Sequence, residues 1–184
     1  MKCSISILIS LFCVNAQHWH QLPIRARGGE IYKRLNVEDA TSSSTFTAEL
    51  PLDHFDTSNN KTFTNYYYTD DSYFDQENGP IFLQMGGEGP VSGCSANDLH
   101  KSFKALALCV EHRFYGTSNP GRDIETIKYL SVEQNLADTA AIVEIVQKNL
   151  GGKARAVLNF GGSYSGATAA WFRDAYVAAL CLSV

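Results

Sequence analysis

ARAVLNFGGSYSG, residues 154–166, joins a short apolar run to a turn of small residues around a serine. Ala154–Phe160 is expected to form a strand, and the helix-like run Ala167–Val177 follows the turn. This order is typical of a nucleophile elbow, G-x-S-x-G, in which the serine occupies a sharp strand-to-helix turn. The last position of the pattern is Ser165 instead of glycine, a mild departure because serine is also small. The pattern favours Ser163 as a nucleophile, and a plain Gly-Ser loop is the alternative.

Strands and helices alternate through the preceding sequence, which indicates an α/β fold with a largely parallel sheet. Besides Ala154–Phe160, the expected strands are Thr45–Leu50, Thr62–Tyr68, Pro80–Met85 and Ala107–Glu111, and the expected helices are Leu99–Leu106 and Ser131–Leu150. In the longer helix, Ser131 and Gln134 fit a capping box, and Gly151-Gly152 is expected to end it. Its apolar residues recur at three- and four-residue spacing at Val132, Leu136, Ala140, Val143 and Val146.

The glycine-rich loop Gly86-Gly87-Glu88-Gly89 follows an apolar strand and suits a second catalytic task. In α/β-hydrolases one oxyanion donor is the peptide N–H after the nucleophile, and the other comes from the loop after the third strand. We therefore expect an oxyanion hole formed by Tyr164, Gly87 and Glu88. A plain turn is the alternative. A phosphate-binding loop is disfavoured because the sequence has no G-x-x-x-x-G-K-[ST].

All five histidines precede the serine, at His18, His20, His54, His100 and His112. The chain order of the triad in α/β-hydrolases is serine, then Asp or Glu, then histidine. None of the five is therefore expected to act as the general base. His112 stands between Glu111 and Arg113, and we expect this tripeptide to form structural hydrogen bonds that brace the glycine-rich loop.

Composition limits the remaining classes of function. The chain has 184 residues, 45% of them hydrophobic, and a formal net charge of −4, with its 15 Lys and Arg scattered singly. This favours one folded domain and disfavours nucleic-acid binding.

Residues 1–16 resemble a signal peptide, with a buried strand or helix as the alternative. Residues 17–45 are expected to form a leader or propeptide-like segment, and residues 46–184 a partial α/β-hydrolase domain. No segment is long and apolar enough for a membrane anchor.

The segment that resembles a signal peptide predicts entry into the secretory pathway, where disulfides and glycans form. Removal of residues 1–16 leaves Cys94, Cys109 and Cys181. Cys94 is the better disulfide candidate, without an assigned partner, and Cys109 is expected to be a buried free thiol. Asn60 begins an N-x-T sequon in a turn-prone stretch, where we expect a glycan. No Cys/His cluster has metal-ligand spacing, and we expect no metal or cofactor.

Five short motifs follow one another at Leu52–Phe55, Gly86–Pro90, Glu111–Gly116, Tyr129–Asp138 and Gly161–Tyr164. Together they resemble the prolyl carboxypeptidase family of serine peptidases, which includes dipeptidyl-peptidase II and the thymus-specific serine protease. The resemblance covers about residues 46–173. The tail after Arg173 departs from the family pattern, and an alternative splice or a misplaced gene boundary would produce it.

The resemblance implies an α/β-hydrolase with a helical insertion domain after the nucleophile region and further C-terminal strands, both missing from this chain. It implies hydrolysis of peptides, usually after proline, in a lysosomal or extracellular setting, and a homodimer of the full-length family member. Ser163 matches the family nucleophile, and no position of this chain receives the catalytic Asp or His. A non-catalytic secreted binding fragment and an esterase or lipase on the same fold are the alternatives.

We predict that the 184-residue chain alone has no useful peptidase activity, because Ser163 lacks a histidine to accept its proton. Loss of triad members typically reduces turnover by roughly 10⁴- to 10⁶-fold. The purified chain is assayed on a proline-containing peptide. Turnover that disappears on Ser163→Ala would contradict the prediction.

Overall fold

The computed structural model describes residues 43–176. The expected signal peptide and most of the expected leader lie outside these residues. The described strands are β1 (Ser44–Pro51), β2 (Thr62–Asp70), β3 (Ile81–Met85), β4 (Leu106–Val110) and β5 (Val157–Phe160). The described helices are α3 (Asp98–Phe103), the 3-10 helix η2 (Ile127–Tyr129), α4 (Val132–Asn149) and α5 (Ser163–Ala175).

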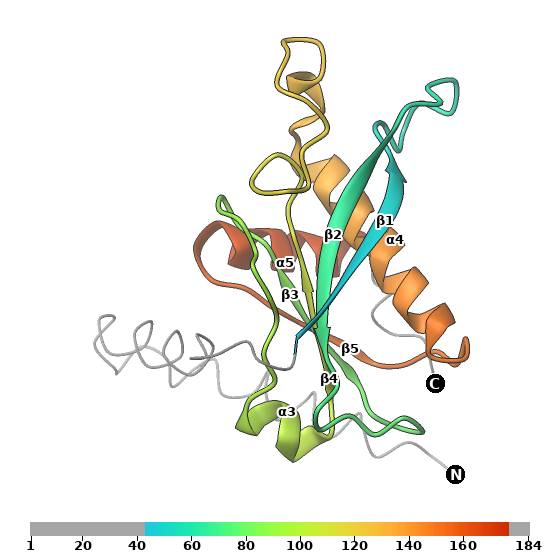
Figure 1. Ribbon diagram of the computed structural model, residues 1–184, viewed down its shortest axis with the longest axis vertical. Helices are drawn as coiled ribbons and strands as arrows, with labels where there is room; N and C mark the ends of the chain where they lie inside the picture. Colours follow the sequence, from blue (N-terminus) through green and yellow to red (C-terminus); the bar gives the residue numbers. More distant parts are fainter. Residues whose placement is uncertain (1–42, 177–184) are drawn as a thin grey trace. The chain divides into compact units, whose positions relative to one another are not determined.

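The strands form one mixed sheet in the order β1-β2-β4-β3-β5 (Figure 1). β3 runs parallel to both β4 and β5, whereas β2 is antiparallel to both β1 and β4. The expected largely parallel sheet is therefore correct only for the last three strands. β1 and β2 are joined by a short hairpin, which requires antiparallel pairing, while the connections through α3 and α4 are long enough for parallel crossovers.

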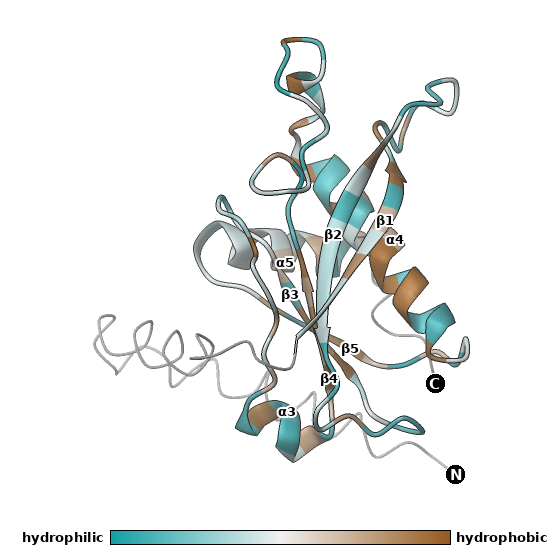
Figure 2. Ribbon diagram, viewed as in Figure 1, coloured by the Kyte–Doolittle hydropathy of each residue, from teal (hydrophilic) through white to brown (hydrophobic). Residues whose placement is uncertain are grey.

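The main core lies between one face of the sheet and the helices α4 and α5. Leu106, Leu108 and Val110 alternate along β4 and join the same buried cluster as Val143 of α4 and Phe172 of α5. The expected apolar positions of α4 all belong to this region, with Leu136, Val143 and Val146 buried and Val132 and Ala140 partly buried. Figure 2 shows α4 with hydrophobic and hydrophilic residues along its length, as expected for a helix that covers a sheet. No helix within residues 43–176 is long and apolar enough to cross a membrane.

The end of α3 and the N-terminal capping of α4 differ from the expectation. α3 ends at Phe103, because Lys104 adopts a left-handed conformation with φ 51° and caps the helix. Leu106 therefore belongs to β4 and not to the helix. α4 begins as expected, with the Ser131 hydroxyl accepting a hydrogen bond from the Gln134 N–H at 3.3 Å. The Gln134 side chain instead binds the loop after β1, donating to Asp53 at 2.6 Å and accepting from the His54 N–H at 3.0 Å.

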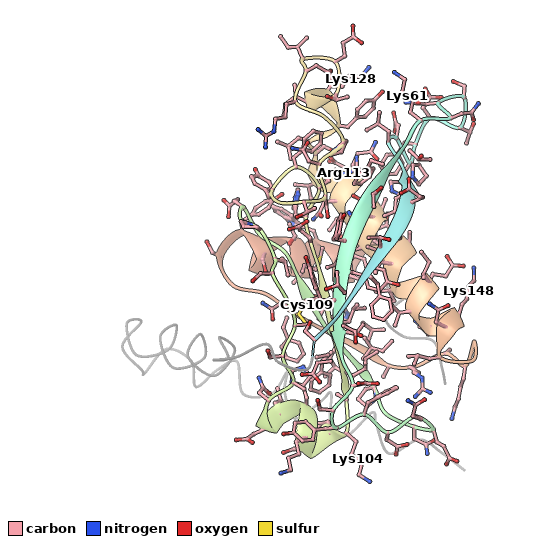
Figure 3. All side chains as sticks on the ribbon, viewed as in Figure 1. Lys61, Lys104, Cys109, Arg113, Lys128 and Lys148 are labelled. Atoms are coloured by element: carbon pink, nitrogen blue, oxygen red, sulfur yellow. A yellow bond between two sulfur atoms is a disulfide. The ribbon has the colours of Figure 1, made fainter. Side chains whose placement is uncertain are left out.

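The expectation of a free thiol at Cys109 is wrong. Cys109 forms a disulfide with Cys94, and their Cα atoms lie 5.5 Å apart (Figure 3). Cys109 points to the face of β4 opposite the main core, where it packs with Ala107 and Tyr68 of the sheet. The segment after β3 folds back across this face and brings Cys94 to it. Local sequence did not reveal the pairing, because the pairing depends on the path of that segment.

A buried ion pair joins the end of β4 to α4. The Asp138 carboxylate accepts hydrogen bonds from Arg113 Nε at 2.6 Å and Arg113 Nη2 at 2.7 Å, and both side chains have no exposed surface. His54 Nε2 lies 2.7 Å from Asp138 Oδ1. The remaining Arg113 N–H groups donate to the backbone oxygens of Leu52 at 2.9 Å, Tyr129 at 3.3 Å and Pro51 at 3.4 Å. Three of the five sequence motifs therefore meet at one cluster, labelled by Arg113 in Figure 3.

We predict that Asp138→Asn lowers the free energy of unfolding by about 3–5 kcal/mol, because it leaves the buried Arg113 guanidinium without its counter-charge. Glu144→Gln on the same helix is the matched control. Glu144 pairs with Lys148 at 2.7 Å, but the two side chains are 66% and 70% exposed, so its loss should change stability by less than about 0.5 kcal/mol. Urea unfolding measures both variants, and equal midpoints for the two would contradict the prediction.

Candidate active site

The expected elbow is present between β5 and α5. Gly162 is the N-cap of α5 and Ser163 is the first helical residue, at the end of a parallel strand. Ser163 has φ 55°, in the left-handed region that residues other than glycine seldom adopt. Such a conformation costs on the order of 1–3 kcal/mol and often occurs at active sites. The Ser163 side chain is exposed. The turn therefore presents a strained, accessible serine.

Small residues around Ser163 are a steric requirement of this turn. A Cβ atom added at Gly161 would lie 2.2 Å from the backbone oxygen of Ser165, far inside van der Waals contact. Gly161 is the first position of G-x-S-x-G, so the pattern reflects real crowding. Ser165 stands at the last position, where its side chain faces Gly87. A Cβ atom at Gly87 would lie 3.7 Å from the Ser165 Cβ, an ordinary contact distance. The Ser165 side chain therefore lies close to the glycine-rich loop without crowding it.

The glycine-rich loop after β3 is thereby brought to the elbow. Gly86 donates its N–H to the Val110 oxygen at 2.8 Å, which places the start of the loop against β4. A Cβ atom at Gly86 would lie 2.8 Å from the His112 nitrogen, so no larger residue fits there. Glu88 is exposed on the same loop. The structure therefore juxtaposes the two segments that carry Tyr164, Gly87 and Glu88, the residues expected to form the oxyanion hole.

Glu111 braces this loop, as the sequence predicted for its tripeptide. Its side chain is fully buried and accepts hydrogen bonds from the Val91 N–H at 3.0 Å and from the Ser118 N–H and hydroxyl at 2.7 Å each. A Cβ atom at Gly116 would lie 1.8 Å from the Glu111 carboxylate. One carboxylate therefore ties the loop after β3 to the loop after β4, and Gly116 leaves room for it.

His112 connects the end of β4 to the elbow. Its Nε2 lies 3.1 Å from the Tyr164 hydroxyl oxygen, and its Nδ1 lies 2.6 Å from the Arg113 carbonyl oxygen. Burial lowers the pKa of His112, against the opposing effect of the hydrogen bond to Arg113. Burial also raises the pKa of Tyr164, with smaller contributions from nearby Tyr115 and Glu88. Burial therefore favours the neutral form of both the imidazole and the phenol.

Sequence reasoning missed the side chains that hold the site from behind. Asp138 was only part of a motif, although a carboxylate between the buried residues Leu136 and Ile142 of α4 requires a buried cation nearby. A charged residue on the buried face of an apolar helix was therefore the sequence signal that could have revealed the ion pair. Asn60 lies outside the site, exposed in the β1–β2 hairpin loop. Among residues 43–176, no group of three or more His, Cys, Asp or Glu side chains could hold a metal ion.

A strained serine between a strand and a helix, next to a glycine-rich loop at the ends of parallel strands, defines an α/β-hydrolase. Comparison with solved structures agrees. An α/β-hydrolase from Novosphingobium aromaticivorans has a TM-score of 0.50 at 17% identity, covering 76% of this chain and 42% of that chain. At this identity the similarity concerns the fold alone.

The chain belongs to the peptidase family Serine carboxypeptidase S28, whose profile matches residues 50–183. Curated relatives include prolyl carboxy peptidase like protein 5 of Caenorhabditis elegans, 38% identical over 140 residues, and lysosomal Pro-X carboxypeptidase of Mus musculus, 32% identical over 190 residues. These alignments cover 70% and 96% of this chain, but only 27% and 39% of the relatives. The family match also passes Arg173, so the resemblance extends further than the motifs alone suggested.

We predict that Gly161→Ala destabilises the fold by about 2 kcal/mol, because the new methyl group would overlap the Ser165 backbone. Gly89→Ala is the matched control, since a Cβ atom there meets nothing within 4 Å. The control should leave stability unchanged or raise it by up to about 1 kcal/mol. Thermal unfolding followed by circular dichroism measures both. A Gly161→Ala protein as stable as the control would show that the turn relaxes without cost.

Proposed function

We propose that the whole protein is a serine-type exopeptidase that hydrolyses peptides at proline-containing sites, with Ser163 as its nucleophile. The observation that carries this proposal is the strained, exposed Ser163 beside the glycine-rich loop in a chain of the S28 family. Lysosomal Pro-X carboxypeptidase, a relative, is named for action at proline. The proline preference here rests on that relationship.

In the proposed mechanism Ser163 attacks the scissile carbonyl while a histidine accepts its proton and an aspartate orients the histidine. The family places both partners beyond the elbow. The peptide N–H groups of Tyr164 and of Gly87 or Glu88 would donate to the developing oxyanion. The N-terminus of α5 adds a favourable field, because its first peptide N–H groups point toward the turn.

A lysosomal or extracellular location belongs to the same proposal. The Cys94–Cys109 disulfide is typical of proteins that fold in an oxidising compartment. Asn60 is exposed and available for a glycan. A glycosidase-sensitive decrease in gel mobility that is absent in Asn60→Gln would support the glycan.

We predict that Ser163→Ala in the full-length protein reduces cleavage of a proline-containing peptide by at least about 10⁴-fold. Ser165→Ala, the matched control two residues away, should lose less than about tenfold, because alanine keeps the Cβ atom and a small side chain at the last position of the turn. Substrates blocked at either the amino or the carboxyl end show from which end the enzyme works. Equal losses in both variants would refute Ser163 as the nucleophile. Turnover of simple esters without turnover of peptides would favour an esterase.

A further inference from the structure

The tripeptide Glu111-His112-Arg113 ends β4, and each of its side chains binds a different part of the molecule. Glu111 holds the loops, Arg113 holds α4 through Asp138, and only His112 reaches the elbow. Because the triad order excludes His112 as the general base, its hydrogen bond to Tyr164 has no role in the proposed mechanism.

The direction of the hydrogen bonds follows from the chemistry of the partners. The Arg113 carbonyl oxygen can only accept, so His112 Nδ1 carries a proton. In a neutral imidazole the other nitrogen is then an acceptor, and the Tyr164 hydroxyl must donate to His112 Nε2. Tyr164 is thereby restrained through its side chain.

His112 is itself held rigidly. It is 1% exposed, and its ring packs edge-on against Tyr115 with ring centroids 4.9 Å apart. Its backbone nitrogen lies against Gly86, where a Cβ atom would come within 2.8 Å. One residue therefore contacts both halves of the proposed oxyanion hole: its backbone touches the glycine-rich loop, and its imidazole binds the residue after Ser163.

We propose that His112 is a positioning residue that sets the Tyr164 peptide N–H relative to the glycine-rich loop. This inference rests on the proposed function of Ser163 as a nucleophile. Oxyanion donors act only within about 2.7–3.1 Å of the developing charge. A displacement of about 1 Å at such a site can reduce turnover by about 10²-fold. Loss of a single neutral hydrogen bond should have a smaller effect than such a displacement and lower kcat by about 3- to 10-fold.

The experiment compares Tyr164→Phe, His112→Leu and the double variant in the full-length enzyme. Tyr164→Phe keeps the ring and the peptide N–H and removes only the hydroxyl. We expect each single variant to lower kcat about 3- to 10-fold with KM within about twofold. The double variant should lose no more than the larger single loss, because both changes remove the same hydrogen bond.

Two further variants separate positioning from folding. Tyr115→Phe is the matched control: it removes the hydroxyl of a ring that packs on the same imidazole and should retain full kcat. His112→Gln keeps a side-chain acceptor and should recover part of the activity lost in His112→Leu. Affinity for a peptide aldehyde, which forms an oxyanion on the serine, should fall in parallel with kcat. If His112→Leu does not fold, Tyr164→Phe and His112→Gln still test the inference.

Unchanged kcat in Tyr164→Phe would overturn the inference, as would losses that multiply in the double variant. A drop in thermal stability without a change in kcat per folded molecule would assign His112 a purely structural role. Ser163→Ala is measured alongside. If it remained active, the proposed function itself would fail. If it were inactive while Tyr164→Phe kept full kcat, only the positioning role would fail.

Discussion

The buried ion pair between Arg113 and Asp138 is the constraint on which the arrangement of the molecule depends. Neither side chain has exposed surface, and a buried charge without a partner would cost several kcal/mol. The guanidinium satisfies its donors with one carboxylate and with backbone oxygens from the loop after β1 and the segment before α4. The hairpin, α4 and the end of β4 can therefore take only positions that preserve this geometry.

The ion pair also fixes the position of the two residues that precede Arg113. Glu111 and His112 are adjacent to the ion pair in the chain, so anchoring Arg113 places their side chains as well. Glu111 then joins the loops after β3 and β4, and His112 contacts Tyr164 at the elbow. A cluster remote from the serine thus determines where the glycine-rich loop and the elbow meet. The Cys94–Cys109 disulfide restrains the same loop further along.

Strain is concentrated where the proposed chemistry occurs. Ser163 and Phe114 both adopt left-handed backbone conformations, with φ 55° and 73°. Ser163 is held by the crowded turn at Gly161, and Phe114 by a hydrogen bond from its N–H to the Ser118 oxygen at 2.8 Å. Among residues 43–176, three non-glycine residues have positive φ: these two lie near the site, and the third, Lys104, caps α3. Such a distribution is expected when a stable sheet supports a strained functional turn.

Local sequence was sufficient to predict that each described strand exists, and to predict α4 with its apolar face and the elbow around Ser163, although β5 begins at Val157 and not at Ala154. These features depend on periodicity, glycine and capping, which act between neighbours in the chain. It was not sufficient to predict the antiparallel pairing of β2 with β4 or the disulfide between Cys94 and Cys109. It also did not predict that the Gln134 side chain binds the loop after β1, or that Asp138 pairs with Arg113. Each of these joins segments that are distant in sequence, and their meeting depends on how the whole sheet is ordered. The hydrogen bond from Tyr164 to His112 spans 52 residues, so only the folded sheet could bring that imidazole to the elbow.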